Sequence, residues 1–146
     1  MKGFTSRLNT CNAAIGLVQL KRLDGWNERR RAIADRYLSK LRGVADLGLP
    51  PKTDSVKLPV YHCFAINTDR RDELAQHLGD RGIATAVHYP IPIHKQPAYT
   101  DDAGHSYRSL PVSERLAERI LSLPLFPTMT DEQVDRVCDE VIHFLR

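Results

Sequence analysis

The chain has 146 residues, of which 42% are hydrophobic and 27% are charged, the composition of one soluble globular domain. The net charge is only +3, and acidic and basic residues are interspersed, which argues against a nucleic-acid or membrane-surface partner. Three cysteines without CxxC spacing argue against a disulfide framework and a structural zinc site, and they favour a reducing, cytoplasmic setting. No apolar run is long enough to span a bilayer, so no membrane partner is expected.

The segment 10–42 carries the strongest helical pattern in the chain. Asn9 or Thr10 is suited to cap its first turn, and Gly43 stands where a residue in the left-handed conformation would end it. A continuous helix of this length would reach about 50 Å, more than a domain of this size needs. We therefore expect it to join two domains and to bend, if anywhere, near Gly25. Its apolar stripe comprises Ile15, Val18, Leu23, Trp26, Ile33, Tyr37 and Leu41.

Three short, mainly antiparallel strands are predicted at 60–67, 83–88 and 120–125. These stretches are rich in the β-branched and aromatic residues that strands favour. A helix over 71–81 separates the first two strands, and Gly82 is expected to end it.

Two further helices are predicted in the C-terminal third of the chain. Pro111 suits the first turn of one of them, because the N–H that proline lacks would be unpaired there. Thr130 and Gln133 form a capping box for the last helix. Together these elements predict a small α+β domain, in which three short strands pack with helices after one long N-terminal helix.

Residues 84–99, ATAVHYPIPIHKQPAY, form the most unusual stretch of the sequence. Its three prolines, at positions 90, 92 and 97, remove backbone donors and fix φ, so we expect a rigid, irregular loop. This loop presents His88, Tyr89 and His94, which suit the wall of a binding site. On these grounds alone, a surface loop with solvated histidines explains the pattern equally well. The two histidines have no nearby cysteine or carboxylate at a zinc-binding spacing, so no metal site is predicted.

Five stretches of sequence carry the strongest functional signal, in this order: GFTSRL, AAIGLVQLKRLDGWNERRRAIADRY, VYHCFAI, RGIATAVHYPIPIHKQPAY and LAERILSLPLFPTMTDEQVDRV. Together they resemble the C-terminal part of the DegT/DnrJ type nucleotide-sugar aminotransferases. The resemblance runs from about Gly3 to the last residue. Neither a GxSxG nucleophile motif nor a glycine-rich phosphate-binding motif points to another class of enzyme.

The resemblance implies a fold-type I aminotransferase that uses pyridoxal phosphate. In that family a large N-terminal domain holds the cofactor and a small C-terminal domain closes over the active site. The enzymes transfer an amino group, usually from glutamate, to a keto sugar linked to a nucleotide. Residues 1–146 would then be the small domain, with 10–42 as the inter-domain helix. The large domain and its cofactor-binding lysine would lie outside this sequence, so the chain alone is expected to bind no cofactor and to be inactive.

The resemblance also assigns individual residues to the site. Thr5 takes the place of a family asparagine that reaches the cofactor phosphate of the partner subunit, and its hydroxyl is a shorter donor. Arg7 matches a family arginine suited to a substrate carboxylate or phosphate. His88, Tyr89 and His94 would stand at the mouth of the active site and contact the nucleotide sugar or help position the amino donor. The expected partners are the missing domain or a full-length homologue, a second copy in a homo-oligomer, and a nucleotide sugar.

An alternative remains open in a different functional class. The chain would then be a non-catalytic module that binds a nucleotide sugar or regulates a partner aminotransferase. Departures from the family pattern over residues 9–16 favour this alternative. In either case the apolar side of the first helix, around Ala13, Ala14, Leu17, Leu20 and Trp26, is expected to lack cover and to cause self-association.

Overall fold

The computed structural model describes residues 6–52, 54, 56–99 and 108–146. Helices and strands follow one another as α1 (Thr10–Leu20), α2 (Leu23–Leu41), β1 (Phe64–Asn67), α3 (Arg71–Asp80), α4 (Pro111–Arg119), β2 (Ile120–Leu123) and α5 (Asp131–Leu145), with two 3-10 turns, η1 (Ile93–Lys95) and η2 (Pro97–Tyr99). This order confirms the predicted α+β class.

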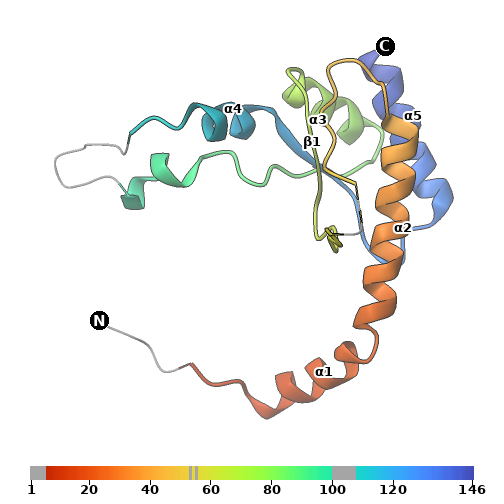
Figure 1. Ribbon diagram of the computed structural model, residues 1–146, viewed down its shortest axis with the longest axis vertical. Coiled ribbons are helices and arrows are strands. Elements are labelled where there is room, and N and C mark those ends of the chain that lie inside the picture. The colour runs from red at the N-terminus through yellow and green to blue at the C-terminus, as the bar shows by residue number, and fades with distance from the viewer. Residues whose placement is uncertain (1–5, 53, 55, 100–107) are drawn as a thin grey trace.

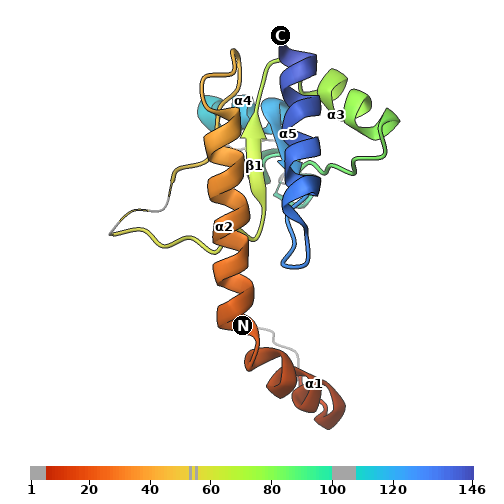
Figure 2. The same ribbon diagram turned by 90° about the vertical axis from the view of Figure 1, so that its right-hand side faces the viewer.

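A small antiparallel sheet of β1 and β2 lies at the centre of the domain (Figures 1 and 2). The two strands pair in a single register, from Phe64 opposite Leu123 to Asn67 opposite Ile120. Helices α2 and α5 lie side by side on one face of the sheet, and α3 packs beside α5. Helix α1 projects away from this body, and α4 extends from the sheet on the other side (Figure 1).

The core fills the space between the sheet and the helices on its covered face. Tyr37 of α2 is fully buried, and its ring lies 4.8 Å from that of Phe64, centroid to centroid. Its hydroxyl donates to the carbonyl oxygen of Pro124 at 2.9 Å, so the one polar atom of this side chain is satisfied. The other fully buried core side chains include Ile33, Leu41, Ile66, Leu74, Leu78, Leu121, Val134, Cys138 and Val141.

An ion-pair network joins α2 to α5 at the edge of this core. Arg36 donates to both carboxylate oxygens of Asp135, at 2.6 and 2.7 Å, and Lys40 lies 2.9 Å from the same carboxylate. The hydrogen bonds from Arg36 and Lys40 hold the pKa of Asp135 below its usual range. The network therefore links the two helices along the edge of the core.

The predicted helix ends are confirmed where they depend on local signals. The Asn9 side chain accepts a hydrogen bond from the backbone N–H of Asn12 at 2.8 Å, and Gly43 has a φ of +80° just after α2. Pro111 stands in the first turn of α4. Thr130 and Gln133 make both hydrogen bonds of a capping box at the start of α5.

The predicted single helix over 10–42 is wrong, because the chain turns at Lys21 and Arg22 and forms two helices. The turn does not coincide with Gly25, which lies inside α2. Helix α1 has no buried residue, whereas α2 is fixed to the core from Ile33 onward. Packing among the described residues therefore does not hold α1 in line with α2.

The predicted second strand, at 83–88, is also wrong. This segment makes only one bridge to the sheet, in which Ala86 and Ser122 exchange two backbone hydrogen bonds of 2.7 and 3.2 Å. In this register Ala84 would stand opposite Pro124, which has no N–H to extend the ladder. Beyond His88 the chain enters the proline-rich stretch, so pairing cannot continue in that direction either.

The two remaining strands are shorter than predicted, for local reasons. The first begins at Phe64, because Tyr61 adopts a φ of +47°, outside the extended region. The last ends at Leu123, immediately before Pro124.

Candidate functional site

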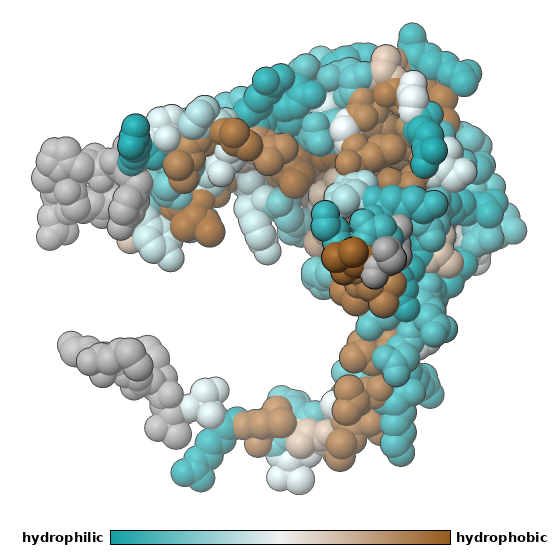
Figure 3. All heavy atoms as spheres, in the orientation of Figure 1, coloured by the Kyte–Doolittle hydropathy of each residue, from teal (hydrophilic) through white to brown (hydrophobic). Residues whose placement is uncertain are grey.

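The proline loop, residues 84–99, runs alongside α4 in an arm that extends from the sheet (Figure 1). The three prolines keep it out of helix and sheet, apart from the two short 3-10 turns. In Figure 3 this arm and α1 stand on opposite sides of a wide hollow, and apolar side chains gather along the arm. The predicted irregular loop is confirmed.

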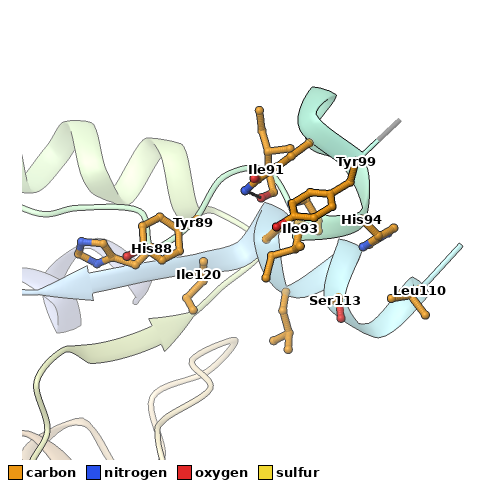
Figure 4. Close-up of a pocket in the computed structure, with 13 residues that line it drawn as sticks. His88, Tyr89, Ile91, Ile93, His94, Tyr99, Leu110, Ser113 and Ile120 are labelled. Carbon is orange, nitrogen blue, oxygen red and sulfur yellow. Dashed lines mark hydrogen bonds between the residues drawn. The ribbon is translucent and has the colours of Figure 1, made fainter. Parts of the chain in front are cut away.

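A pocket of about 700 Å³ lies between the proline loop and α4 (Figure 4). Most of its lining is apolar, from Ile91 and Ile93 of the loop to Leu116 of α4 and Ile120, the first residue of β2. The polar side chains on its wall belong mainly to the loop, and they are His88, Tyr89, His94, Gln96 and Tyr99, with Ser113 from α4. Such a pocket suits a ligand that has an apolar face and a few groups that form hydrogen bonds.

Glu114 of α4 fastens the proline loop to the helix. Its carboxylate lies 3.0 Å from Nε2 of His94 and 2.8 Å from Nζ of Lys95. It also accepts hydrogen bonds from the backbone N–H of Leu110 at 2.8 Å and from the Ser109 hydroxyl at 3.0 Å. These partners, with Lys95 and His94 the strongest, lower the pKa of Glu114 to about 2. His94, which is only 9% exposed, thus both holds the proline loop to α4 and lines the pocket.

His88 has a different environment from His94. Its Nδ1 lies 2.9 Å from the hydroxyl of Ser122, a residue of β2 that is only 5% exposed. The His88 ring is itself exposed and meets the ring of Tyr89 edge to face, at 5.4 Å between centroids. Tyr89 is 72% exposed, so both side chains are accessible to a ligand.

The structure brings together three of the five site residues inferred from the sequence. His88, Tyr89 and His94 line one pocket, with Tyr89 and His94 on either side of Ile93 in Figure 4. Thr5 lies outside the described residues. Arg7 is exposed, does not line the pocket, and precedes α1, which stands apart from the arm (Figure 1).

Sequence reasoning missed Glu114 and Ser122. Glu114 carried one local signal, since acidic residues are common in the first turn of a helix. Nothing in the sequence around Ser122 distinguishes it from any other serine in a short strand. Both residues act through partners that lie 20 and 34 positions away in the chain.

The described residues do not form a pyridoxal phosphate site by themselves. None of the lysines in the described part of the chain lines the pocket, and Lys40 and Lys95 are ion-paired with Asp135 and Glu114. Within the same residues, no three His, Cys, Asp or Glu side chains gather closely enough to hold a metal ion. No described helix is long and apolar enough to cross a membrane.

Residues 1–142 match the DegT/DnrJ/EryC1/StrS aminotransferase family. The chain is 47% identical over 143 residues to the dTDP-3-amino-3,4,6-trideoxy-alpha-D-glucose transaminase of Streptomyces venezuelae, a match that covers 96% of this chain and 36% of that protein. It is 40% identical over 140 residues to the erythromycin biosynthesis sensory transduction protein EryC1 of Saccharopolyspora erythraea, covering 94% of this chain and 37% of that protein.

Solved structures agree with these sequence relatives. The structure of DesV from S. venezuelae matches with a TM-score of 0.91 and 43% identity, over 100% of this chain and 39% of that one. The structure of NtdA from Bacillus subtilis with bound cofactor PMP matches with a TM-score of 0.83 and 33% identity, over 98% of this chain and 34% of that one. The chain therefore spans less than two fifths of the length of these relatives. The resemblance to the C-terminal part of sugar aminotransferases is confirmed, and the chain belongs to the DegT/DnrJ/EryC1/StrS aminotransferase family.

Proposed function

We propose that residues 1–146 are the small domain of a cytoplasmic, pyridoxal phosphate-dependent aminotransferase that moves an amino group from glutamate to a nucleotide-linked keto sugar. The observation that carries this proposal is the pocket in which His88, Tyr89 and His94 meet. The relatives support the substrate class and the cofactor, since one is named as a transaminase of a dTDP-linked sugar and another was solved with the bound cofactor PMP.

In this proposal the pocket holds the sugar nucleotide. His88 and Tyr89 supply groups that form hydrogen bonds at the exposed end of the pocket. The apolar side chains beneath them pack against the less polar face of the sugar and exclude water. His94 forms part of the pocket wall but does not offer Nε2 to the ligand, because that nitrogen is already paired with Glu114.

The cofactor would be held by residues outside the described part of the chain. Pyridoxal phosphate, when bound, carries the amino group between the two substrates. None of the lysines in the described part of the chain lines the pocket. Thr5 and Arg7 are proposed to serve the site of a neighbouring subunit in a homo-oligomer, since the family resemblance gives the position of Thr5 that role and Arg7 does not line the pocket of its own chain.

The non-catalytic alternative, a module that binds a nucleotide sugar or regulates a partner, rests only on the departures over residues 9–16. The relatives give it no better support than they give the aminotransferase proposal.

A chimeric enzyme tests the proposal. The chain replaces the segment that it matches in the S. venezuelae transaminase, and the chimera is given pyridoxal phosphate, 2-oxoglutarate and dTDP-3-amino-3,4,6-trideoxy-alpha-D-glucose. We expect glutamate to form. We also expect His88→Ala to raise KM for the sugar nucleotide by about tenfold, the usual cost of a lost hydrogen bond. A folded chimera that shows the absorbance of bound cofactor but forms no glutamate would rule the proposal out.

The uncovered apolar face of α1 predicts self-association of the 146-residue chain. No residue of α1 is buried, and Ile15, Leu17 and Leu20 are 57%, 64% and 64% exposed. Light scattering is expected to show a mass that rises with concentration, and the double variant L17E/L20E is expected to remain monomeric. Val56→Glu, which changes an 87% exposed side chain outside α1, is the control and should associate like the wild type. A wild-type chain that stays monomeric over a wide concentration range would contradict this prediction.

A further inference from the structure

We propose that Ser122 is a positioning residue for His88, which it holds through Nδ1 so that Nε2 is left for the substrate. The inference rests on the proposed function, because only that function places a substrate at His88. It adds to a site built mainly from the proline loop and α4 a polar side chain of the central sheet.

Ser122 is held in place from both sides. Within β2 it stands opposite Ala65 of β1, and on its other edge it exchanges two backbone hydrogen bonds with Ala86. Its neighbours Leu121 and Leu123 face the core under α2 and α5, so alternation along the strand turns the Ser122 side chain to the opposite face of the sheet. A side chain fixed in this way is a rigid support.

The same geometry brings His88 to Ser122. Residues directly opposite in an antiparallel pair share a face, and so do residues two apart along an extended chain. Ala86 is opposite Ser122, and His88 follows it by two positions. The Nδ1 to Oγ distance of 2.9 Å is that of a well-formed hydrogen bond.

Each group has one partner in the described part of the chain. The nearly buried Ser122 hydroxyl bonds only to His88, and the His88 ring bonds only through Nδ1. Its Nε2 has no hydrogen-bond partner among the described residues. When one ring nitrogen of a histidine is fixed in this way, the orientation of the other is fixed too.

A serine beside His88 allows both protonation states of the His88 ring nitrogen, unlike the carboxylate of Glu114 beside His94. Glu114 can only accept a hydrogen bond, so it requires His94 to carry a proton on Nε2. A serine hydroxyl both donates and accepts, so Ser122 can hold His88 with or without a proton on Nδ1. His88 can therefore present Nε2 as a donor or as an acceptor while its ring stays in place.

The matched variants Ser122→Thr and Ser122→Val test the inference, because threonine and valine have the same shape and only threonine keeps the hydroxyl. In the 146-residue chain, long-range ¹H–¹⁵N spectra of histidine report the state of both ring nitrogens. We expect the Thr variant to keep the wild-type His88 signals and the Val variant to shift Nδ1 toward the value of free imidazole. Unchanged amide signals of Ala65 and Ala86 would show that the sheet is intact. If valine disrupts the fold, Ser122→Ala provides the same comparison.

In the chimera, Ser122→Val is expected to raise KM for the sugar nucleotide about three- to tenfold, and Ser122→Thr is expected to restore it. Identical His88 spectra in the Thr and Val variants would overturn the inference. It would also be overturned if His88→Ala raised KM but Ser122→Val did not. If His88→Ala itself left KM unchanged, the proposed function of His88 would fail instead, so the two failures are distinguishable.

Discussion

Replacing Phe64 by alanine is expected to lower the free energy of unfolding by about 3 to 5 kcal/mol, the usual cost of removing a fully buried phenylalanine. The Phe64 side chain is 0% exposed, and its ring packs between those of Tyr37 and Tyr61, at centroid distances of 4.8 and 6.2 Å. It stands where β1, α2 and the segment before the strand meet. A cavity at this point therefore loosens all three.

Urea denaturation followed by far-ultraviolet circular dichroism measures this effect. The matched control is Phe126→Ala, the same substitution at a side chain that is 43% exposed, which is expected to cost clearly less. Equal losses at the two positions would contradict the packing described for Phe64.

Replacing Glu114 by glutamine is expected to release the proline loop from α4. Glutamine keeps one acceptor oxygen but has no charge to balance Lys95 and His94. Amide hydrogen exchange should therefore speed up about tenfold at Leu110, whose N–H donates to the Glu114 carboxylate at 2.8 Å, with a similar increase across the loop. The control is Glu118→Gln, one turn further along α4, because Glu118 is exposed and forms no ion pair with any described residue. Its exchange rates are expected to match those of the wild type.

The same carboxylate predicts a pH dependence with a definite sign. The pKa of Glu114 is lowered from 4.5 to about 2 in the folded chain, so the folded state binds its proton more weakly than the unfolded state. Its contribution to stability is fully present above about pH 4.5 and is lost as the pH falls toward 2. Relative to the intrinsic rate of an unprotected amide at the same pH, exchange at Leu110 should increase as the pH falls through this window in the wild type and change less in Glu114→Gln. An equal pH response in both proteins would contradict the role given to Glu114.

The features that depend on neighbours within about four residues could be predicted from the sequence alone. Asn9 caps α1, Gly43 follows α2 with a positive φ, and Thr130 and Gln133 close the capping box of α5. Each of these is a short-range hydrogen bond or backbone preference, so the residues involved are visible side by side in the chain. The motifs in chain order also identified the family, because a shared order of several patterns is far more specific than any one of them.

Contacts between residues far apart in the chain became visible with the fold. The segment 83–88, predicted as the second strand, contains suitable residues, but Pro124 would stand opposite Ala84 and limits the pairing to the single bridge between Ala86 and Ser122. Glu114 and Ser122 give the two loop histidines different roles, one fixed by an acceptor and one held by a hydroxyl. Neither contact follows from local sequence, because each joins residues brought together by the pairing of β2 and the packing of α4. For His88, Tyr89 and His94 the sequence therefore identified the loop that carries them, and the fold decided which side chain is free to bind.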